Sequence, residues 1–447
     1  MSDIQKLSVY DGRVIQERPS YSVQKGALSL TNSPFNAIAA TSSQMTFSVQ
    51  VPSLNVFMDR ELMITAGVNC RMNVDVAGVS AAPAVVDTPV VVFGKDVALA
   101  PFPLQSLMTT ATATINDAVS TLNVSDVLYE TLRFVDQKEN RAQRTTPTML
   151  DKYAKYDTAV GAINNPLGSY FDATNSENIP NGSFYDVVFT DSTGSALNGT
   201  GTYNDGSNTI NYTNGVPVLS NDAGTGNALE SYGIFFRFKV TEKLILSPFI
   251  FNEECGNDVG LFGVNNVQLV FNFGNGVSRV IRNAPLASGD EGRTVSAVQF
   301  LGAAPFQAPR CNVTFLTPPL DISLPPRSIV PFMEYPRYIS TPNQAIPSGG
   351  SATLQTQTIT LPQIPDMLLI YAKPQSYSPQ EGDFYYPIDQ ISINMDNYAG
   401  LLSSHSPEQL YNMSFSNGLE MDWNTWSGRA RVVNTDAGAN APGSSEA

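Results

Sequence analysis

The sequence predicts an all-β protein in which two similar barrels follow one another along the chain. The composition is that of short strands and many turns, because 15% of the 447 residues are charged while 32 are Gly and 30 are Pro; a typical soluble domain has about 25% charged residues. A strand that leads into a short helix occurs twice, at 111–134 and at 389–415. A duplicated unit in a chain otherwise rich in strands indicates two copies of one architecture.

The repeated unit is recognised by the order of its elements. In each copy an alternating strand ends in Ile-Asn, a polar turn follows, and a short helix begins at a Ser N-cap and contains a Leu-Tyr pair. The corresponding residues are Ile115, Asn116, Ser125, Leu128 and Tyr129 in the first copy, and Ile393, Asn394, Ser406, Leu410 and Tyr411 in the second. In the second copy Ser406, Pro407 and Gln409 predict a capping box, and Gly418 predicts the end of the helix.

The first half is expected to contain an arm and the first barrel. Residues 1–43 are predicted to be an irregular arm, because Pro19 and Pro34 interrupt any apolar period. The first barrel is expected over 44–285 and begins with an alternating strand from Met45 to Val51. Further strands are predicted at 60–69, 85–93, 234–241, 243–251 and 267–273, and a short helix at 146–156.

Residues 160–230 differ from the strands around them. They are rich in Gly, Asn and Ser, with short strands predicted at 183–190 and 208–213. A structureless loop of this length is uncommon in a compact domain. We therefore expect an ordered excursion that stands off the rim of the first barrel.

The second half is predicted to be shorter than the first. Residues 284–294 are expected to link the halves, the second barrel to occupy 295–433, and 434–447 to be a flexible tail. Strands are predicted at 295–301, 311–317, 328–339, 353–361, 366–373 and 390–395. Only 29 residues follow Gly418, so a second barrel built like the first would lack closing strands. Because open sheet edges promote association, we expect that the chain is cut short here or that the missing strands come from elsewhere.

Charge and cysteine usage limit the possible classes of protein. The net charge at pH 7 is −15, and residues 1–25 carry four basic and three acidic side chains, so we expect no direct sequence-specific binding of nucleic acid. The odd, widely spaced Cys70, Cys255 and Cys311 indicate buried thiols rather than a disulfide framework. No apolar run typical of a signal peptide or a membrane span is expected. These features disfavour the alternative, a secreted or surface β-sandwich adhesin or carbohydrate-binding module.

The sequence contains no pattern typical of a catalytic, metal or cofactor site. His405 is the only histidine, and we interpret it as a turn residue before the second helix rather than as part of a nucleophilic triad. No phosphate-binding or nucleophile-elbow motif and no zinc-ligand spacing occurs. Glu253, Glu254 and Asp383 are loop acids without the pairing that a glycosidase needs. Residues 204–208 loosely match a calcium loop but lack its closing glutamate, so we predict a turn.

The residues also resemble a known family. The most specific segments are SPFIFNEECGNDVGLFGVNN at 247–266 and the stretch from INMDNYAGLLSS to NGLEMDW at 393–423. In order and character they are similar to the major capsid proteins of polinton-like and adintovirus-type DNA viruses, which belong to the double jelly-roll lineage. The similarity extends from about residue 19 to residue 428, and relatives continue into further strands past this point.

The resemblance implies a fold and a function. It implies two eight-stranded jelly rolls in each chain, a homotrimer of pseudo-hexameric outline that tiles an icosahedral virion capsid, and outer towers formed by loops such as 160–230. Its partners would be copies of itself, neighbouring capsomers, penton proteins and minor capsid proteins, with no cofactor and no active site. Candidate assembly residues are Phe35 and Ile38 in the arm, and Trp423 and Trp426, since aromatic residues are common interface anchors.

Overall fold

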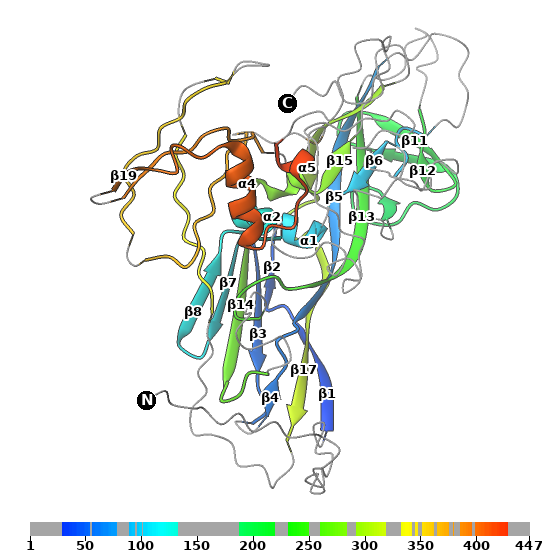
Figure 1. Ribbon diagram of the computed structural model, residues 1–447. Helices are drawn as coiled ribbons and strands as arrows, with labels where there is room; N and C mark the ends of the chain where they lie inside the picture. Colours follow the sequence, from blue (N-terminus) through cyan, green and yellow to red (C-terminus); the bar gives the residue numbers. More distant parts are fainter. Residues whose placement is uncertain are drawn as a thin grey trace, which may run out of the picture.

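The computed structural model describes a β protein with a few short helices (Figure 1). The described residues are 29–53, 56–77, 89–93, 96–100, 102–132, 187–219, 231–249, 260–283, 292–318, 332–341, 345–346, 351–361, 364–374, 379, 385–395 and 398–427. Several expectations fall outside these residues, namely the helix at 146–156, the tail at 434–447, most of the arm, and the side chains of Cys255, Glu253, Glu254 and Asp383.

Two antiparallel sheets form the body of the first half. The larger sheet has the order β1 (Ser29–Asn36), β17 (Phe306–Thr317), β5 (Met63–Ala77), β13 (Ser231–Lys243) and β9 (Val187–Thr190), with β16 (Gly292–Phe300) beside β5 and β4 (Phe57–Met58) beside β17. The smaller sheet has the order β2 (Ala39–Ala40), β3 (Gln44–Gln50), β14 (Asn266–Phe273), β7 (Met108–Ile115) and β8 (Ala118–Leu122). Every strand pair in both sheets is antiparallel.

The core lies between these two sheets. Successive side chains of a strand point to opposite faces, so the alternation seen in the sequence places every second residue inside. Phe47 of β3 and Phe271 of β14 meet edge to face with their ring centroids 6.0 Å apart. Phe236 and Phe238 of β13 belong to the same buried cluster. Each buried Phe contributes about 1.5–3 kcal/mol through removal of apolar surface from water.

Strands β16 and β17 correct the expected boundary between the halves. We expected the second barrel to begin at 295, but both strands pair with β5, from Gly292 opposite Ala77 to Asn312 opposite Met63. Together they act as one long strand, interrupted between Phe300 and Phe306. The pairing follows from the length of β5, because its fifteen residues can bond to both β16 and β17 along one edge.

The arm also differs from its prediction where it is described. Residues 29–36 form β1 rather than an irregular segment, and they pair with β17 along their whole length. Pro34 is accommodated because β1 is an edge strand, where a missing N–H is tolerated. The last part of the arm therefore extends the larger sheet by one strand.

The excursion at 160–230 is ordered over its described part. Strand β9 joins the edge of the larger sheet beside β13. Strands β10 (Gly201–Asn204), β11 (Thr209–Thr213) and β12 (Val216–Pro217) form a separate small sheet. Residues 204–208 are the turn between β10 and β11, as predicted.

Each copy of the repeated unit is a hairpin followed by a helix. In the first, β7 and β8 lead into α2 (Val124–Leu132), and in the second, β18 (Ile393–Met395) and β19 (Tyr398–Leu401) lead into α4 (Pro407–Ser416). The predicted cap at Ser406 and its capping box are present, and Gly418 follows α4 with a φ of 93°. The predicted cap at Ser125 is wrong, because α2 begins one residue earlier.

The second half contains little regular structure in its described residues. It includes β18, β19, α4 and α5 (Trp423–Ser427), and it lies to the left of the first barrel in Figure 1. The strands predicted at 353–361 and 366–373 are not found as ladders. Among described residues they have only an isolated bridge between Ala372 and Tyr386.

The remaining elements lie at one end of the first barrel. They are β6 (Val97–Leu99) paired with β15 (Ile281–Asn283), α1 (Pro103–Ser106), and a 3-10 helix at Asn275–Arg279. Asn283 is fully buried and its side chain donates to the carbonyl oxygens of Asp96 and Arg293 while accepting from Val295 N–H. This amide therefore joins β15 to β16.

Candidate assembly surface

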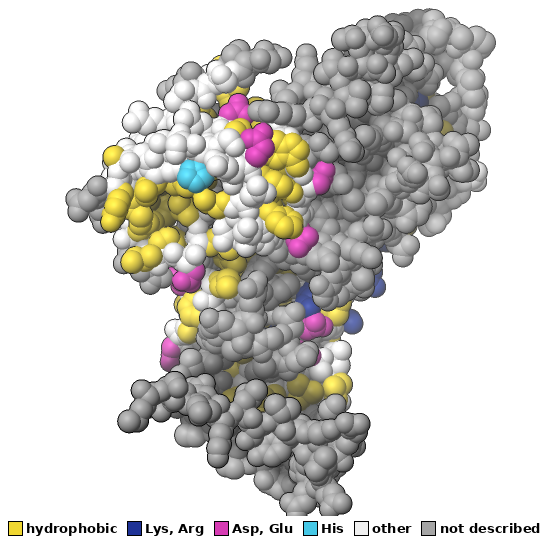
Figure 2. All heavy atoms as spheres, in the orientation of Figure 1, with side chains coloured by type: hydrophobic (Ala, Val, Ile, Leu, Met, Phe, Trp, Pro, Cys, Tyr) yellow, Lys and Arg dark blue, Asp and Glu magenta, His cyan; other side chains and the backbone are white. Residues whose placement is uncertain are grey.

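Large hydrophobic side chains are exposed mainly in the second half of the chain. Among the described residues, nineteen such side chains are exposed, of which fifteen lie between Phe332 and Phe415 and four lie elsewhere. The fifteen are Phe332, Met333, Tyr338, Ile339, Leu354, Ile359, Ile364, Met367, Leu368, Ile370, Met395, Tyr398, Leu401, Met413 and Phe415. We call this set the C-terminal apolar surface. Figure 2 shows hydrophobic side chains gathered beside the single histidine, His405.

The exposure of individual members is high. Ile364 is 86% exposed and Tyr398 is 70% exposed, whereas the apolar side chains that alternate along β3, β5, β13 and β14 are buried. Exposed large apolar side chains in this number are uncommon on a soluble monomer and usually mark an interaction site. The arrangement can therefore bury apolar area against another protein surface.

The two halves meet at helix α2. Asp126 and Glu130 lie one turn apart on α2, and Lys373 approaches both, with its Nζ 3.3 Å from Glu130 Oε1 and 3.8 Å from Asp126 Oδ1. Arg337 forms an ion pair with Asp126. The hydroxyl of Tyr371 donates to the carbonyl oxygen of Asp126 at 2.6 Å. These contacts attach the first part of the second half to the first barrel.

Burial changes the acid–base behaviour of this junction. Glu130 is 5% exposed, and its burial raises the pKa of its carboxyl group, although Lys373 and a hydrogen bond from Tyr385 act in the opposite direction. Burial also raises the pKa of Tyr371, and the nearby carboxylate of Glu130 adds to this effect. The ion pair between Glu130 and Lys373 thus lies in a partly desolvated environment.

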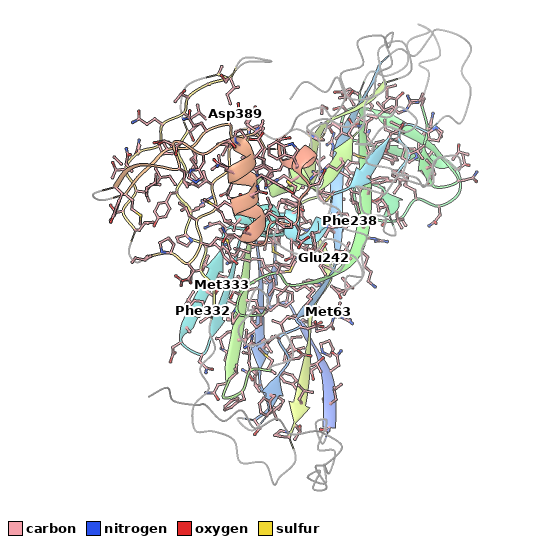
Figure 3. All side chains as sticks on the ribbon, in the orientation of Figure 1. Met63, Phe238, Glu242, Phe332, Met333 and Asp389 are labelled. Atoms are coloured by element: carbon pink, nitrogen blue, oxygen red, sulfur yellow. The ribbon has the colours of Figure 1, made fainter. Side chains whose placement is uncertain are left out.

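A further contact ties the second half to the loop before β14. Met333 N–H donates to the hydroxyl of Ser247 at 2.8 Å, and Figure 3 shows Phe332 and Met333 side by side at this place. The hydroxyl of Ser120 on β8 in turn donates to the carbonyl oxygen of Ser247 at 2.7 Å. The chain therefore enters the C-terminal apolar surface from a fixed point on the first barrel.

The predicted assembly residues of the arm have different surroundings. Phe35 packs on Phe315 of β17 with an interplanar angle of 82° and ring centroids 6.2 Å apart, so it anchors β1 on its own sheet. Ile38 is 71% exposed. The structure thus separates the two residues that were predicted to act together, and only Ile38 presents most of its side chain to solvent.

The predicted pair on α5 forms an aromatic cluster with α4. Trp423 and Trp426 stack with their ring centroids 5.6 Å apart, and Tyr411 lies 5.4 Å and 5.7 Å from them. The Tyr411 hydroxyl donates to the carbonyl oxygen of Met421 at 3.0 Å. Both tryptophans are half-buried. They hold α5 against α4, next to the exposed Phe415 of the C-terminal apolar surface.

The other polar candidates have structural surroundings. His405 lies between β19 and α4, as predicted, and its backbone N–H donates to Leu402 O at 3.0 Å. Cys70 and Cys311 are free, buried thiols in the core. Burial raises the pKa of both thiol groups, that of Cys311 to about 12, so neither is reactive at neutral pH.

The described residues contain neither a group of metal ligands nor a membrane-spanning helix. Within the described ranges, no three His, Cys, Asp or Glu side chains are grouped as metal ligands. No helix in the same part of the chain has the length and apolar character needed to cross a membrane.

The sequence-based prediction did not identify the α2 junction. Asp126 and Glu130 are spaced four residues apart on a predicted helix, and this spacing was the available signal. Their partners Arg337, Tyr371 and Lys373 lie more than 200 residues away, so nothing local points to them.

Two family models match the chain. The model described as Sputnik virophage major capsid protein 1st domain matches residues 2–316, and the model described as Major capsid protein V20 C-terminal domain matches residues 335–446. A curated relative, capsid protein V20 of Sputnik virophage, is 24% identical over 420 residues, which are 91% of this chain and 62% of the relative. The chain thus spans less than two thirds of that relative's length.

Solved structures share the fold over nearly the whole chain. The cryo-EM structure of the Sputnik virophage matches with a TM-score of 0.62 and 19% identity, over 94% of this chain and 76% of the matched chain. The crystal structure of the mavirus major capsid protein matches with a TM-score of 0.56 and 13% identity, over 96% and 77% respectively. The expected double jelly-roll fold class is confirmed by these likenesses.

Proposed function

Because this chain belongs to the Sputnik virophage major capsid protein family, we propose that it is a structural subunit of a viral capsid shell. Its copies associate as homotrimers of pseudo-hexameric outline, and the trimers tile an icosahedral capsid in the virion. The partners are therefore other copies of the chain, neighbouring capsomers, and the penton and minor capsid proteins of the same particle. The role is structural rather than catalytic.

The observation that carries this proposal is the C-terminal apolar surface. Its fifteen exposed side chains remain in water in a single chain, and their burial between chains supplies a driving force of about 25 cal/mol per Å² of apolar area. Permanent interfaces bury about 2,000–5,000 Å² and are more hydrophobic than transient ones. A surface that is apolar and lies beside a rigid barrel suits such a permanent contact.

The low density of charge supports the same role. Only 15% of the residues are charged, and charged groups are depleted at the centres of protein interfaces. A protein that covers much of its surface with copies of itself needs few charges for solubility. Ile38 extends this apolar character to the opposite end of the chain, where β1 forms the edge of the larger sheet.

The mass and shape of the purified full chain test the proposal. We expect particles of three 48.2 kDa chains by light scattering, and hexagonal outlines of the same particles by electron microscopy. A protein that stays monomeric at all accessible concentrations would overturn the proposal.

Substitutions on the proposed interface sharpen the test. Ile364→Asn and Tyr398→Asn each place an amide where the proposal buries an apolar side chain, so we expect weaker association. The matched control is Val119→Asn, because Val119 on β8 is 54% exposed but lies outside the C-terminal apolar surface. Equal association of all three variants would contradict the assignment of the interface.

A further inference from the structure

The outer face of the larger sheet carries a row of three side chains. Arg71 of β5 lies directly opposite Phe235 of β13 on one side and Gln299 of β16 on the other. The neighbour of Arg71, Cys70, points into the core, so the alternation of β5 directs Arg71 outward. Register therefore places a cation, an aromatic ring and an amide side by side.

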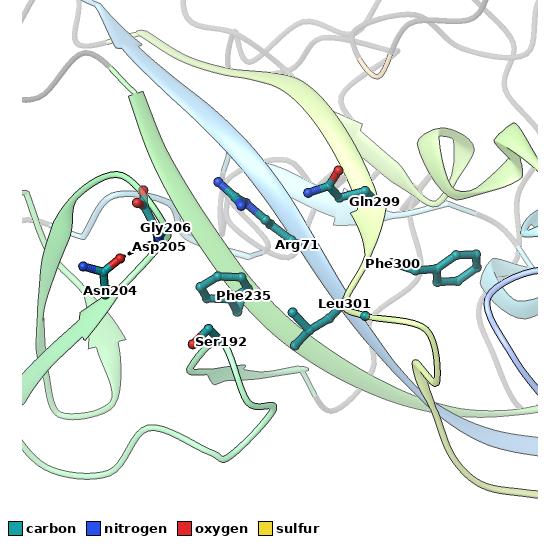
Figure 4. Close-up of a pocket in the computed structure, with 10 residues that line it drawn as sticks. Arg71, Ser192, Asn204, Asp205, Gly206, Phe235, Gln299, Phe300 and Leu301 are labelled. Atoms are coloured by element: carbon teal, nitrogen blue, oxygen red, sulfur yellow. Dashed lines mark hydrogen bonds between the residues drawn. The ribbon is translucent and has the colours of Figure 1, made fainter.

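Loops enclose this row and leave an open cavity of about 350 Å³. One wall is the tip of the β10–β11 hairpin, with Asn204, Asp205 and Gly206, and another is the segment from Phe300 to Gly302 that interrupts the long β16–β17 strand. Ser192 comes from the loop after β9. Figure 4 shows the Arg71 side chain between Gln299 and Phe235, with Asn204 and Asp205 across the cavity. The volume lies in the range of small-ligand sites.

Arg71 is held in place without using its terminal nitrogens. Its Nε donates to Asn73 Oδ1 at 3.2 Å, and its guanidinium lies over the ring of Phe235 at 5.6 Å from the centroid. In the described part of the chain, no hydrogen bond of either terminal nitrogen of Arg71 is found. A guanidinium that is fixed by its Nε and by stacking is pre-organised to bind a carboxylate through two parallel hydrogen bonds.

Asp205 lies near Arg71, but its oxygens have other partners. Oδ1 accepts from the N–H groups of Ser207 and Asn208 at 2.8 Å and 2.6 Å, and Oδ2 accepts from Gly233 N–H at 2.9 Å. Burial alone would raise the pKa of Asp205, but these N–H groups, together with the charge of Arg71, lower it. Asp205 therefore fixes the β10–β11 hairpin to β13 and forms no hydrogen bond with the two terminal nitrogens of Arg71.

The other residues that line the cavity have side chains that suit a sugar ring. Asn204 uses its Oδ1 to accept from Gly206 N–H at 2.7 Å, which directs its amide without consuming the donor side. Gln299 is exposed and adds a second amide, while Leu301 adds an apolar side chain beside the ring of Phe235. Amides next to an aromatic and aliphatic surface provide hydrogen bonds for hydroxyl groups and contact for the apolar face of a sugar.

We propose that this cavity binds a carboxylated monosaccharide. The carboxylate pairs with the two terminal nitrogens of Arg71, the ring hydroxyls bond to the amides of Asn204 and Gln299, and the apolar ring face packs on Leu301. This function is independent of assembly, because the row lies in the first barrel and uses no member of the C-terminal apolar surface.

The test compares three small probes on the purified full chain by ligand-observed NMR. Methyl glucuronide carries both the carboxylate and the ring, methyl glucoside carries the ring alone, and acetate carries the carboxylate alone. We expect the glucuronide to bind at least about tenfold more tightly than the glucoside, because a charge-assisted pair is worth more than about 1.4 kcal/mol. We expect it also to bind more tightly than acetate, because acetate lacks the ring hydroxyls and the apolar ring face. Equal binding of glucuronide and acetate, equal binding of glucuronide and glucoside, or no binding at millimolar concentration would overturn the proposal.

Variants locate the binding in the cavity. Arg71→Gln is expected to reduce glucuronide affinity at least about tenfold, and Gln299→Ala, at an exposed position, is expected to reduce it less. The control is Arg237→Gln, because Arg237 lies on β13 and bonds to Gln307 Oε1 at 3.2 Å outside the cavity. Affinity that survives both Arg71→Gln and Gln299→Ala would contradict the site, and near-ultraviolet circular dichroism checks that each variant keeps its fold.

Discussion

The carboxylate of Glu242 on β13 accepts hydrogen bonds from the backbone N–H groups at the start of α1. Leu104 N–H lies 2.8 Å from Oε1, and Gln105 N–H lies 3.0 Å from Oε2. The side chain of Gln105 extends this contact, since it donates to Lys243 O at 3.0 Å and accepts from Ile245 N–H at 2.9 Å. Figure 3 places Glu242 where β13 passes α1. A strand of the larger sheet is thereby connected to the helix that leads into β7 of the smaller sheet.

Replacement of Glu242 by Gln should destabilise this connection. Glu242 is 3% exposed, and the amide of Gln would direct an N–H group at one of two backbone donors, leaving a buried donor unpaired. We expect the free energy of unfolding in urea to fall by about 1–3 kcal/mol. The control is Glu61→Gln, because Glu61 forms an exposed ion pair with Lys243 and should cost less than about 1 kcal/mol. Equal effects of the two substitutions would contradict the structural role of Glu242.

Glu130 on α2 should make the free energy of unfolding depend on pH. Burial raises the pKa of Glu130 in the folded state, so the folded protein holds this proton more tightly than the unfolded chain does. The resulting stabilisation is complete below the ordinary pKa of a glutamate and is lost as the pH rises through the raised value. Compared with Glu130→Gln, which does not titrate, the wild-type protein should become progressively less stable as the pH rises above the ordinary pKa of a glutamate, about 4.3.

Urea unfolding of both proteins across this range checks the prediction. Groups other than Glu130 titrate in both proteins, so the difference between the two free energies of unfolding isolates Glu130. A difference that stays constant, or that changes in the opposite direction, would show that the ion pair with Lys373 outweighs the burial of Glu130.

The strand pattern of the first barrel could be predicted from the sequence because it is local. Alternation from Met45 to Val51 identifies β3, and the same alternation identifies most of β13 and β14. The helix caps were predicted only in part. Ser406 carries a capping box, whereas Ser125 lies inside α2, because a serine within a short helix and a serine before it look alike without a box.

The features that the sequence did not predict depend on contacts between distant residues. The sequence places residues 295–317 in the second barrel because they follow a polar segment, yet their ladder partner is β5, more than 200 residues earlier. The row of Gln299, Arg71 and Phe235 has the same origin, since only the register of three strands brings these residues together. The family resemblance was confirmed, whereas the roles of Phe35, Ile38, Trp423 and Trp426 in assembly remain predictions.

Salt should strengthen the association of this protein with itself. The chain carries a net charge of −15 at pH 7, so copies repel one another, and the Debye length falls from about 10 Å at 0.1 M to about 3 Å at 1 M salt. The apolar contacts of the C-terminal apolar surface do not weaken under the same change. We expect the association constant from sedimentation to rise between low and high salt. A steady fall would indicate that attraction between opposite charges, rather than apolar burial, holds the copies together.

The two tryptophans make the contact between α4 and α5 directly observable. Trp423 and Trp426 are the only tryptophans in the chain, so intrinsic tryptophan fluorescence reports on this cluster alone. Tyr411 touches both indole rings, and its removal in Tyr411→Ala should admit water to them. We therefore expect a red-shifted emission and faster quenching by acrylamide. The control is Val119→Ala, because Val119 is 54% exposed and lies outside both the cluster and the C-terminal apolar surface.

The same signal separates an internal role of the cluster from a role in assembly. If the indoles are buried further by a neighbouring copy, as predicted for assembly anchors, quenching by acrylamide should slow as the protein concentration rises through the association range. Ile364→Asn, which weakens association, should restore fast quenching at high concentration without touching the indoles. Quenching that does not change with concentration, while light scattering shows association, would assign Trp423 and Trp426 to the packing of α5 on α4 alone, because half-buried rings outside the interface keep the same access to solvent in every oligomer.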